Sequence, residues 1–210
     1  MIAAGSLEYA FARMQSRLSR RPSEGTWAAI EEARTLAPIV DAARGTSLET
    51  LLAALPPQPG LPETDRAART AWMRTVDEAA GWMPPEWGPA LAWCKAQPGD
   101  ELRAKPHPTL LPSLAHPEWR RRWPAGAADP GLADLARRVE AHLARFRIAQ
   151  PHEATALRRA FEEGLLAFFR RHPVAPSAAF AWLALAALDL ERLRGEIERR
   201  LAFPEARIAA

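Results

Sequence analysis

Cysteine, tyrosine and lysine are scarce in this sequence, which has one cysteine and one tyrosine in 210 residues. A single cysteine cannot form an internal disulfide, so the chain is not a disulfide-stabilised secreted domain. Because Cys94 follows Trp93 in an apolar stretch, we expect a buried structural thiol rather than a reactive one. The only lysines are Lys95 and Lys105, so arginine carries nearly all of the positive charge.

Long hydrophobic runs are also missing. The longest uncharged apolar stretch extends from Val174 to Leu188 and contains Pro176 near its start. It is shorter than the roughly 20 residues that a membrane-spanning helix needs. The first residues lack the basic region and apolar core of a signal peptide. We therefore expect a cytoplasmic protein, and leave open a peripheral association with the inner membrane.

The sequence lacks the usual motifs of catalysis and nucleotide binding. Neither G-x-x-x-x-G-K, nor G-x-G-x-x-G, nor G-x-S-x-G occurs. The adjacent acids Glu31–Glu32 and Glu162–Glu163 point to different parts of a helix surface, so they are not acid/base pairs. We predict no catalytic residue, no cofactor site and no direct nucleotide binding, and hence a protein that is not an enzyme.

The histidines do not have the spacing of metal ligands. No two of them are three or four residues apart, and Cys94 has no partner cysteine. We predict no metal site and expect the histidines to lie at the surface or at helix caps. They are His107, His116, His142, His152 and His172.

What the sequence does contain is typical of a folded helical protein. Hydrophobic residues make up 48% and charged residues 25%, which argues against disorder. The net charge is +3 and the pI is 9.7, and acidic and basic residues alternate along the chain. This mixture indicates solvated helix faces with local ion pairs and is only weak evidence for nucleic-acid binding.

The sequence predicts an all-α fold, a multi-helix orthogonal bundle of two lobes. Alanine, leucine, arginine and glutamate dominate, and no alternating run of β-branched residues suggests a sheet. The proline-rich segments Pro56–Pro62 and Pro124–Gly131 separate three helical segments, 1–55, 63–123 and 131–210. Within them we expect helices near 7–18, from Ser23 onward, at 35–43 and 47–55, a helical block over about 63–103, a short helix around Trp119, and helices at 132–147, 152–172 and 177–202.

The last predicted helix has the clearest apolar stripe, with Leu183, Leu190 and Ile197 seven residues apart. Its first half is apolar on all sides and its second half is charged. We expect a buried side formed by Trp182, Leu183, Leu190, Leu193 and Ile197. On the opposite face we expect Arg192, Arg199 and Arg200 to be exposed to solvent.

Tryptophan is abundant, with eight residues. Trp72, Trp82, Trp87 and Trp93 lie in one block of the sequence. Trp119 and Trp123 lie four residues apart around three arginines, so on a helix both rings would share a face. Three interpretations stay open for this region: core packing, a protein interface, and a platform that stacks on single-stranded nucleic acid.

Both ends of the sequence contain residues in a recognisable order. The front stretch LEYAFARMQSRLSRRPSEGTWAAIEEARTLAPIVDAARGT contains Tyr9, the pair Ala12–Arg13, and Thr46. The back stretch AAFAWLALAALDLERLRGEIERRLAFPEARI contains Asp189, Glu191, Leu193, Arg194, Phe203 and Pro204. In these residues the two ends resemble the C subunit of rotary V/A-type ATPases, which is the d subunit in eukaryotes. The stretch PGDELRA keeps Asp100, Leu102 and Arg103 of an internal motif of that family but lacks its asparagine.

The resemblance implies a shortened, divergent member with a truncated form of the family's helical funnel. Its implied function is non-catalytic: an assembly or coupling subunit between the central shaft and the membrane rotor ring, in contact with a membrane only through that complex. A generic helical adaptor, or a nucleic-acid-binding protein that uses arginine and tryptophan, are the alternatives. The candidate interface residues are Arg13, Trp119, Arg120, Arg121, Arg122, Trp123, Arg194, Arg199 and Arg200.

Overall fold

A computed structural model describes residues 5–95, 111–127 and 129–203. Within these ranges every regular element is a helix, which confirms the all-α prediction. The elements are α1 (Leu7–Leu18), α2 (Glu24–Glu32), α3 (Leu36–Ala43), α4 (Glu49–Leu52), α5 (Leu61–Trp82), the 3-10 helix η1 (Pro85–Trp87), α6 (Gly88–Lys95), α7 (Pro112–Ala115), α8 (Pro117–Arg121), α9 (Pro130–Ile148), α10 (Pro151–Arg171) and α11 (Pro176–Ala202).

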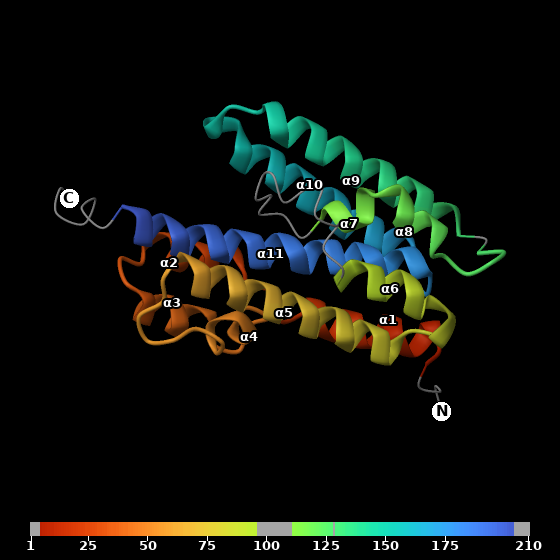
Figure 1. The fold of residues 1–210 in the computed structure, drawn as a ribbon, viewed down its shortest axis with the longest axis horizontal. Coiled ribbons are helices and arrows are strands. Elements are labelled where there is room, and N and C mark those ends of the chain that lie inside the picture. Colours follow the sequence, from red (N-terminus) through yellow and green to blue (C-terminus); the bar gives the residue numbers. More distant parts are fainter. Residues whose placement is uncertain (1–4, 96–110, 128, 204–210) are drawn as a thin grey trace.

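Helix α11 lies in the middle of the molecule (Figure 1). It packs against α5 and α1 on one side and against α9 and α10 on the other. Helices α5 and α11 are antiparallel, because Asp65 near the start of α5 meets Arg194 and Trp82 at its end meets Trp182. The long helices α5, α9, α10 and α11 extend along the length of the molecule in this view.

One hydrophobic cluster contains the buried apolar residues of all three sequence segments. Ile30 comes from the first segment, Trp87 from the second and Phe180 from the third, and each is at most 4% exposed. The predicted division into two lobes is therefore not confirmed, because no separate core belongs to either lobe in the described part of the chain. None of the described helices combines the length and apolarity needed to cross a bilayer.

Asp129 joins the starts of two long helices. One of its carboxylate oxygens accepts a hydrogen bond from the backbone N–H of Gly131 in α9, and the other accepts from that of Ser177 in α11, both at 2.8 Å. The two helix starts approach so closely that a Cβ on Gly131 would lie 2.5 Å from the Ser177 hydroxyl oxygen. Glycine at position 131 is therefore required by packing rather than by backbone conformation.

The apolar stripe of α11 is buried as predicted: the five residues named for it are at most 5% exposed. The prediction for the arginines is right for Arg199, whose side chain is 55% exposed, but wrong for Arg192 and Arg200, at 21% and 9%. The reason is that α2 lies against this part of α11. Arg192 stacks on the Trp27 ring, and Arg200 donates to backbone carbonyls at the end of α2.

Candidate functional site

The three arginines predicted at an interface around α8 are exposed, and each lies beside an acidic side chain. Arg120 pairs with Glu140 at 3.1 Å, Arg121 pairs with Glu118, and Arg122 lies 3.9 Å from Glu118. Such exposed pairs contribute little to stability and leave the local charge nearly balanced. An interface role for these arginines stays a prediction.

The two tryptophans of this region do not form an exposed stacking platform. Trp119 is fully buried, and its ring packs edge-on against Phe180 and Trp123, at centroid distances of 4.9 and 5.1 Å. Of the three interpretations, core packing is therefore correct for Trp119, and its place in a surface interface was a wrong prediction. Trp123 is half-buried and follows Arg122, the residue that caps the end of α8.

Core packing also holds for most of the other tryptophan block. Trp72, Trp82 and Trp87 are buried, whereas Trp93 is half-buried. The indole N–H of Trp72 donates to the backbone oxygen of Cys94 at 2.9 Å. Cys94 itself is buried, as predicted.

The remaining candidate interface residues are distributed over the molecule. Arg13 is exposed on α1, with its guanidinium 5.5 Å from the centre of the Trp82 ring. Arg194 is buried and pairs with Asp65 and Glu198 at 3.3 and 3.6 Å, so its prediction as a surface residue was wrong. Helix α8 and the C-terminal end of α11 lie toward opposite ends of the molecule (Figure 1), so the predicted residues do not form one patch.

A buried ion cluster that was not predicted joins three distant parts of the chain. The guanidinium of Arg21 donates to both carboxylate oxygens of Asp189 at 2.7 Å and to Glu162 at 2.9 Å. Burial alone would lower the pKa of Arg21, but these two acids outweigh it and raise that pKa. Burial raises the pKa of Asp189, against the opposing effect of Arg21. The cluster fixes the segment after α1 against α10 and α11.

One sequence signal could have revealed this cluster. Asp189 follows the uncharged run that ends at Leu188 and lies seven residues after Trp182, which belongs to the predicted buried side of α11. A carboxylate inside an apolar stripe needs a charged partner to be buried. The resemblance named Asp189 without giving it a partner, and nothing in the sequence marked Arg21 as that partner.

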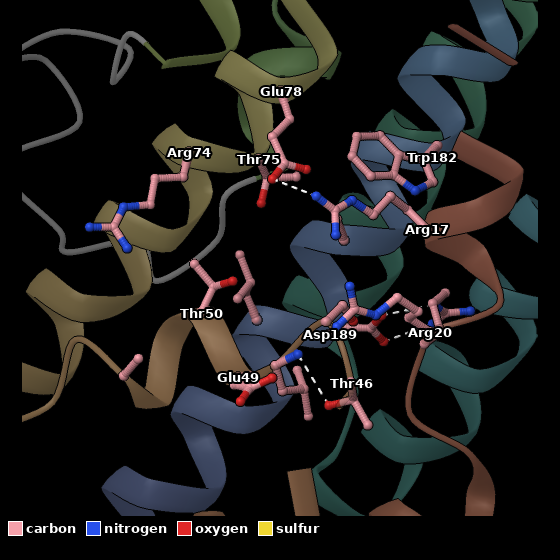
Figure 2. A pocket seen from close by; sticks show the side chains of 16 residues that line it. Arg17, Arg20, Thr46, Glu49, Thr50, Arg74, Thr75, Glu78, Trp182 and Asp189 are labelled. Atoms are coloured by element: carbon pink, nitrogen blue, oxygen red, sulfur yellow. Dashed lines mark hydrogen bonds and ion pairs between the residues drawn. The ribbon is translucent and has the colours of Figure 1, made fainter. Parts of the chain in front are cut away.

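A pocket of about 470 Å³ lies next to this cluster. Its walls come from α1 and the residues just after it, from residues 46–53, from α5 and from α11 (Figure 2). Four arginines line it, Arg17, Arg20, Arg21 and Arg74, together with three acidic residues, Glu49, Glu78 and Asp189. Its apolar surface comes from residues that include Trp182, Ala186 and Leu190.

The charges that line the pocket differ in how far they are neutralised. Arg17 pairs with Glu78 at 2.8 Å, and Arg21 is held by the buried cluster. Arg20 uses its Nε to donate to the backbone oxygen of Gly45 at 3.3 Å and has no acidic partner among the described residues. Arg74 has no hydrogen-bond or ion-pair partner among the residues that the structure describes. In Figure 2 these last two arginines lie on opposite sides of the view.

The histidines were expected at the surface or at helix caps, and the structure agrees for His116 but not for His142. His116 caps α8, because its Nδ1 accepts from the Glu118 backbone N–H at 3.2 Å. His142 is buried and stacks on Phe161 with ring centres 4.0 Å apart, so its predicted surface or cap position was wrong. Burial and the nearby charge of Arg158 lower the pKa of His142 to about 4.

The described part of the chain contains no cluster of three or more residues that could hold a metal ion. No protein-family model, no curated protein and no solved structure matches the chain. The resemblance to the rotary ATPase family therefore rests on the residues quoted above and stays a prediction. Four of those residues and one histidine lie outside the described ranges: Asp100, Leu102, Arg103, Pro204 and His107.

Proposed function

We propose that this chain is a non-catalytic helical protein that couples or assembles other proteins, and that it acts as a coupling subunit of a rotary V/A-type ATPase. The observation that carries the proposal is the way α11 is held. Asp129 caps its start, Arg21 binds Asp189 in its middle, and Arg200 binds the end of α2. The central helix is thus fixed to its neighbours at three places along its length.

A body built in this way suits the transmission of force. Close-packed interiors have low compressibility and transmit strain. Helix α11 adds a buried apolar face along most of its length and contacts α1, α5, α9 and α10. A force applied at one end of the molecule would therefore move the helices together.

The exposed surface favours a protein partner over nucleic acid. Arg120, Arg121 and Arg122 lie beside acids, and Trp119 is not accessible to bases. A mixed surface of paired charges can orient a protein partner, whereas phosphate binding favours unpaired positive charge. The nucleic-acid alternative has lost its main support, and the generic adaptor stays as the second candidate.

In the rotary ATPase, the proposed partners are the central shaft and the membrane rotor ring, and the chain would lie on the cytoplasmic side without entering the bilayer. Among the residues of the resemblance, Asp189 and Arg194 have buried side chains. Asp189 pairs with Arg21, and Arg194 pairs with Asp65. Their contribution to this function would be to hold α11 in place. Contact with partners would fall to exposed residues such as Arg13, Arg121 and Arg199.

The test is a pull-down of purified shaft and rotor-ring proteins with the intact chain. We expect capture of at least one of them, and weaker capture by Arg121→Glu or Arg199→Glu. A matched control is Arg147→Glu, which changes an exposed arginine with no hydrogen-bond or ion-pair partner in the described part of the chain. Failure to bind either protein, with the fold intact, would reject the rotary ATPase proposal and leave the adaptor. Salt-sensitive binding of DNA or RNA would instead favour the nucleic-acid alternative.

A further inference from the structure

We infer that the pocket between α1, residues 46–53, α5 and α11 binds a small organic anion that carries a carboxylate or phosphate on an apolar body. This inference does not depend on the rotary ATPase proposal. It rests on the balance of free and occupied polar groups around the pocket, on the apolar surface inside it, and on its size.

The polar groups left free are mainly donors. Arg74 is exposed and has no partner in the described part of the chain, and Arg20 has used only its Nε, toward the Gly45 backbone oxygen. The hydroxyls of Ser47 and Thr50 also have no partner there. Among the described lining residues, two guanidinium groups and two hydroxyls are thus left without a charged partner, against one free acid, Glu49. Guanidinium groups bind carboxylates and phosphates with paired, charge-assisted hydrogen bonds, so this arrangement favours an anion.

Two of the three acids that line the pocket are already occupied. Both oxygens of Asp189 accept from Arg21, and Glu78 accepts from Arg17. The Arg21 pair is largely buried, with side chains 12% and 6% exposed, so it is well shielded from exchange with a ligand. These pairs therefore hold the pocket wall in place and leave Arg20 and Arg74 as the cations that a ligand can meet.

The rest of the lining is apolar. Trp182, Ala186 and Leu190 on α11 contribute to it, with Ala53 from residues 46–53. An inorganic anion would leave this surface uncovered, whereas an anion with an apolar body would cover it and gain from its burial. The volume of about 470 Å³ is within the range of small-molecule sites. Walls from four segments favour a small molecule over a peptide, which needs open ends.

The experiment is a calorimetric titration of the intact chain with four related probes: phenylacetate, phenyl phosphate, benzyl alcohol and inorganic phosphate. We expect at least one of the two aromatic anions to bind at least about tenfold more tightly than benzyl alcohol or inorganic phosphate. The ratio between the two aromatic anions will show whether carboxylate or phosphate is preferred.

Substitutions locate the site. Arg74→Gln and Arg20→Gln should each weaken binding of the preferred aromatic anion about tenfold, because each removes a charge-assisted contact. Ala186→Leu should weaken binding of the aromatic anions by filling the apolar surface without changing charge. Arg170→Gln is the matched control and should leave binding unchanged, since Arg170 is an exposed arginine on α10 that does not line the pocket. Circular dichroism of each variant checks that the fold is kept.

Three results would overturn the inference. The first is binding of benzyl alcohol as tight as that of both aromatic anions, which would mean an apolar site without anion recognition. The second is binding unaffected by both Arg74→Gln and Ala186→Leu, which would place the ligand elsewhere. The third is no binding of either aromatic anion at concentrations up to about 10 mM.

Discussion

Arg199 and Arg200 are neighbours in the sequence, yet their side chains are 55% and 9% exposed. Arg199 pairs with Glu196 at 2.9 Å on α11 and makes a single longer contact with α2, a hydrogen bond of 3.4 Å to the backbone oxygen of Glu31. Arg200 points toward α2, where it donates to the backbone oxygens of Ala33 at 2.6 Å and Glu31 at 3.1 Å, and also to that of Ile30. The last carbonyls of a helix have no partner within the helix, so a guanidinium group that binds them satisfies acceptors that would otherwise be exposed.

Arg200→Ala should therefore lower the free energy of unfolding by about 1–3 kcal/mol, because several charge-assisted hydrogen bonds to the end of α2 are lost. Arg199→Ala should change it by no more than about 0.5 kcal/mol. Chemical denaturation of the two variants beside the unmodified chain measures the difference. Equal effects of the two substitutions would show that Arg200 does not hold α2 to α11.

His142 should make the stability of the protein depend on pH. Burial, with a contribution from Arg158, lowers its pKa from 6.5 to about 4. As the pH falls from 6.5 toward 4, the unfolded chain takes up a proton at this histidine while the folded chain does not. Proton uptake then favours unfolding, so the stabilisation present above pH 6.5 is lost as the pH approaches 4.

His142→Phe keeps an aromatic ring beside Phe161 and removes the titrating group. Glu196 and Asp134 also have lowered pKa values, so they contribute to the pH dependence of stability in both the unmodified chain and the variant. The difference in free energy of unfolding between the two proteins isolates His142. We expect this difference to shift in favour of the variant as the pH falls from 6.5 to 4, as followed by denaturation. A constant difference over this range would contradict the prediction.

Several helices of this protein begin at a capping residue or a proline. Ser6 caps α1 and Ser23 caps α2, each by accepting a backbone N–H three residues later. Proline at the first turn of α5, α9, α10 and α11 favours helix starts, since its missing N–H has no partner there in any helix. Asp129 differs from the serine caps because its carboxylate accepts hydrogen bonds from the first turns of two helices, α9 and α11.

Asp129→Ala should lower the free energy of unfolding by about 2 kcal/mol, since it removes the caps of both α9 and α11. Asp129→Asn should have a free energy of unfolding between those of Asp129→Ala and the unmodified chain, because the amide keeps one acceptor oxygen. Asp134→Ala is the control: its carboxylate pairs only with the exposed Arg137 and Arg138 of its own helix, so we expect a change within about 0.5 kcal/mol. Thermal denaturation of the three variants distinguishes a double cap from an ordinary surface aspartate.

At the scale of the whole molecule, one core and one buried ion cluster hold the helices together. The core contains residues from all described parts of the chain. Arg21 adds a polar connection across it, from the segment after α1 to α10 and α11. A buried charge that loses its partner costs more than the pair contributed, because the remaining charge is left without compensation.

Arg21→Met should accordingly destabilise the protein by about 3–5 kcal/mol, because Asp189 is then left unpaired in the core. The double variant Arg21→Met, Asp189→Leu should recover much of this loss, since the most deeply buried acid is removed and only Glu162, with its side chain 25% exposed, loses a partner. Glu162→Gln should cost less than Arg21→Met, because the Glu162 side chain is 25% exposed. Chemical denaturation compares the four proteins. A double variant as unstable as Arg21→Met would mean that shape, rather than charge compensation, makes this position sensitive.

Most of the helices could be predicted from the sequence, because their signals are local, although the predicted helical stretch 63–103 is interrupted after Trp82. Capping residues, prolines and the seven-residue apolar spacing in α11 act within a few turns of the chain. They gave the helix of residues 7–18 at its observed bounds, and the buried stripe of Leu183, Leu190 and Ile197. The absence of alternating apolar runs likewise excluded a sheet, and the described structure contains none.

The partners of the charged residues and the place of the pocket depend instead on how the helices pack together. Arg21 and Asp189 are 168 positions apart, and four separate segments line the pocket. The burial of Trp119 in α8 could not be read from a helix of five residues, because so short an element shows no apolar period. Local patterns record which face of a helix is apolar, but which other helix covers that face depends on contacts between residues distant in the chain.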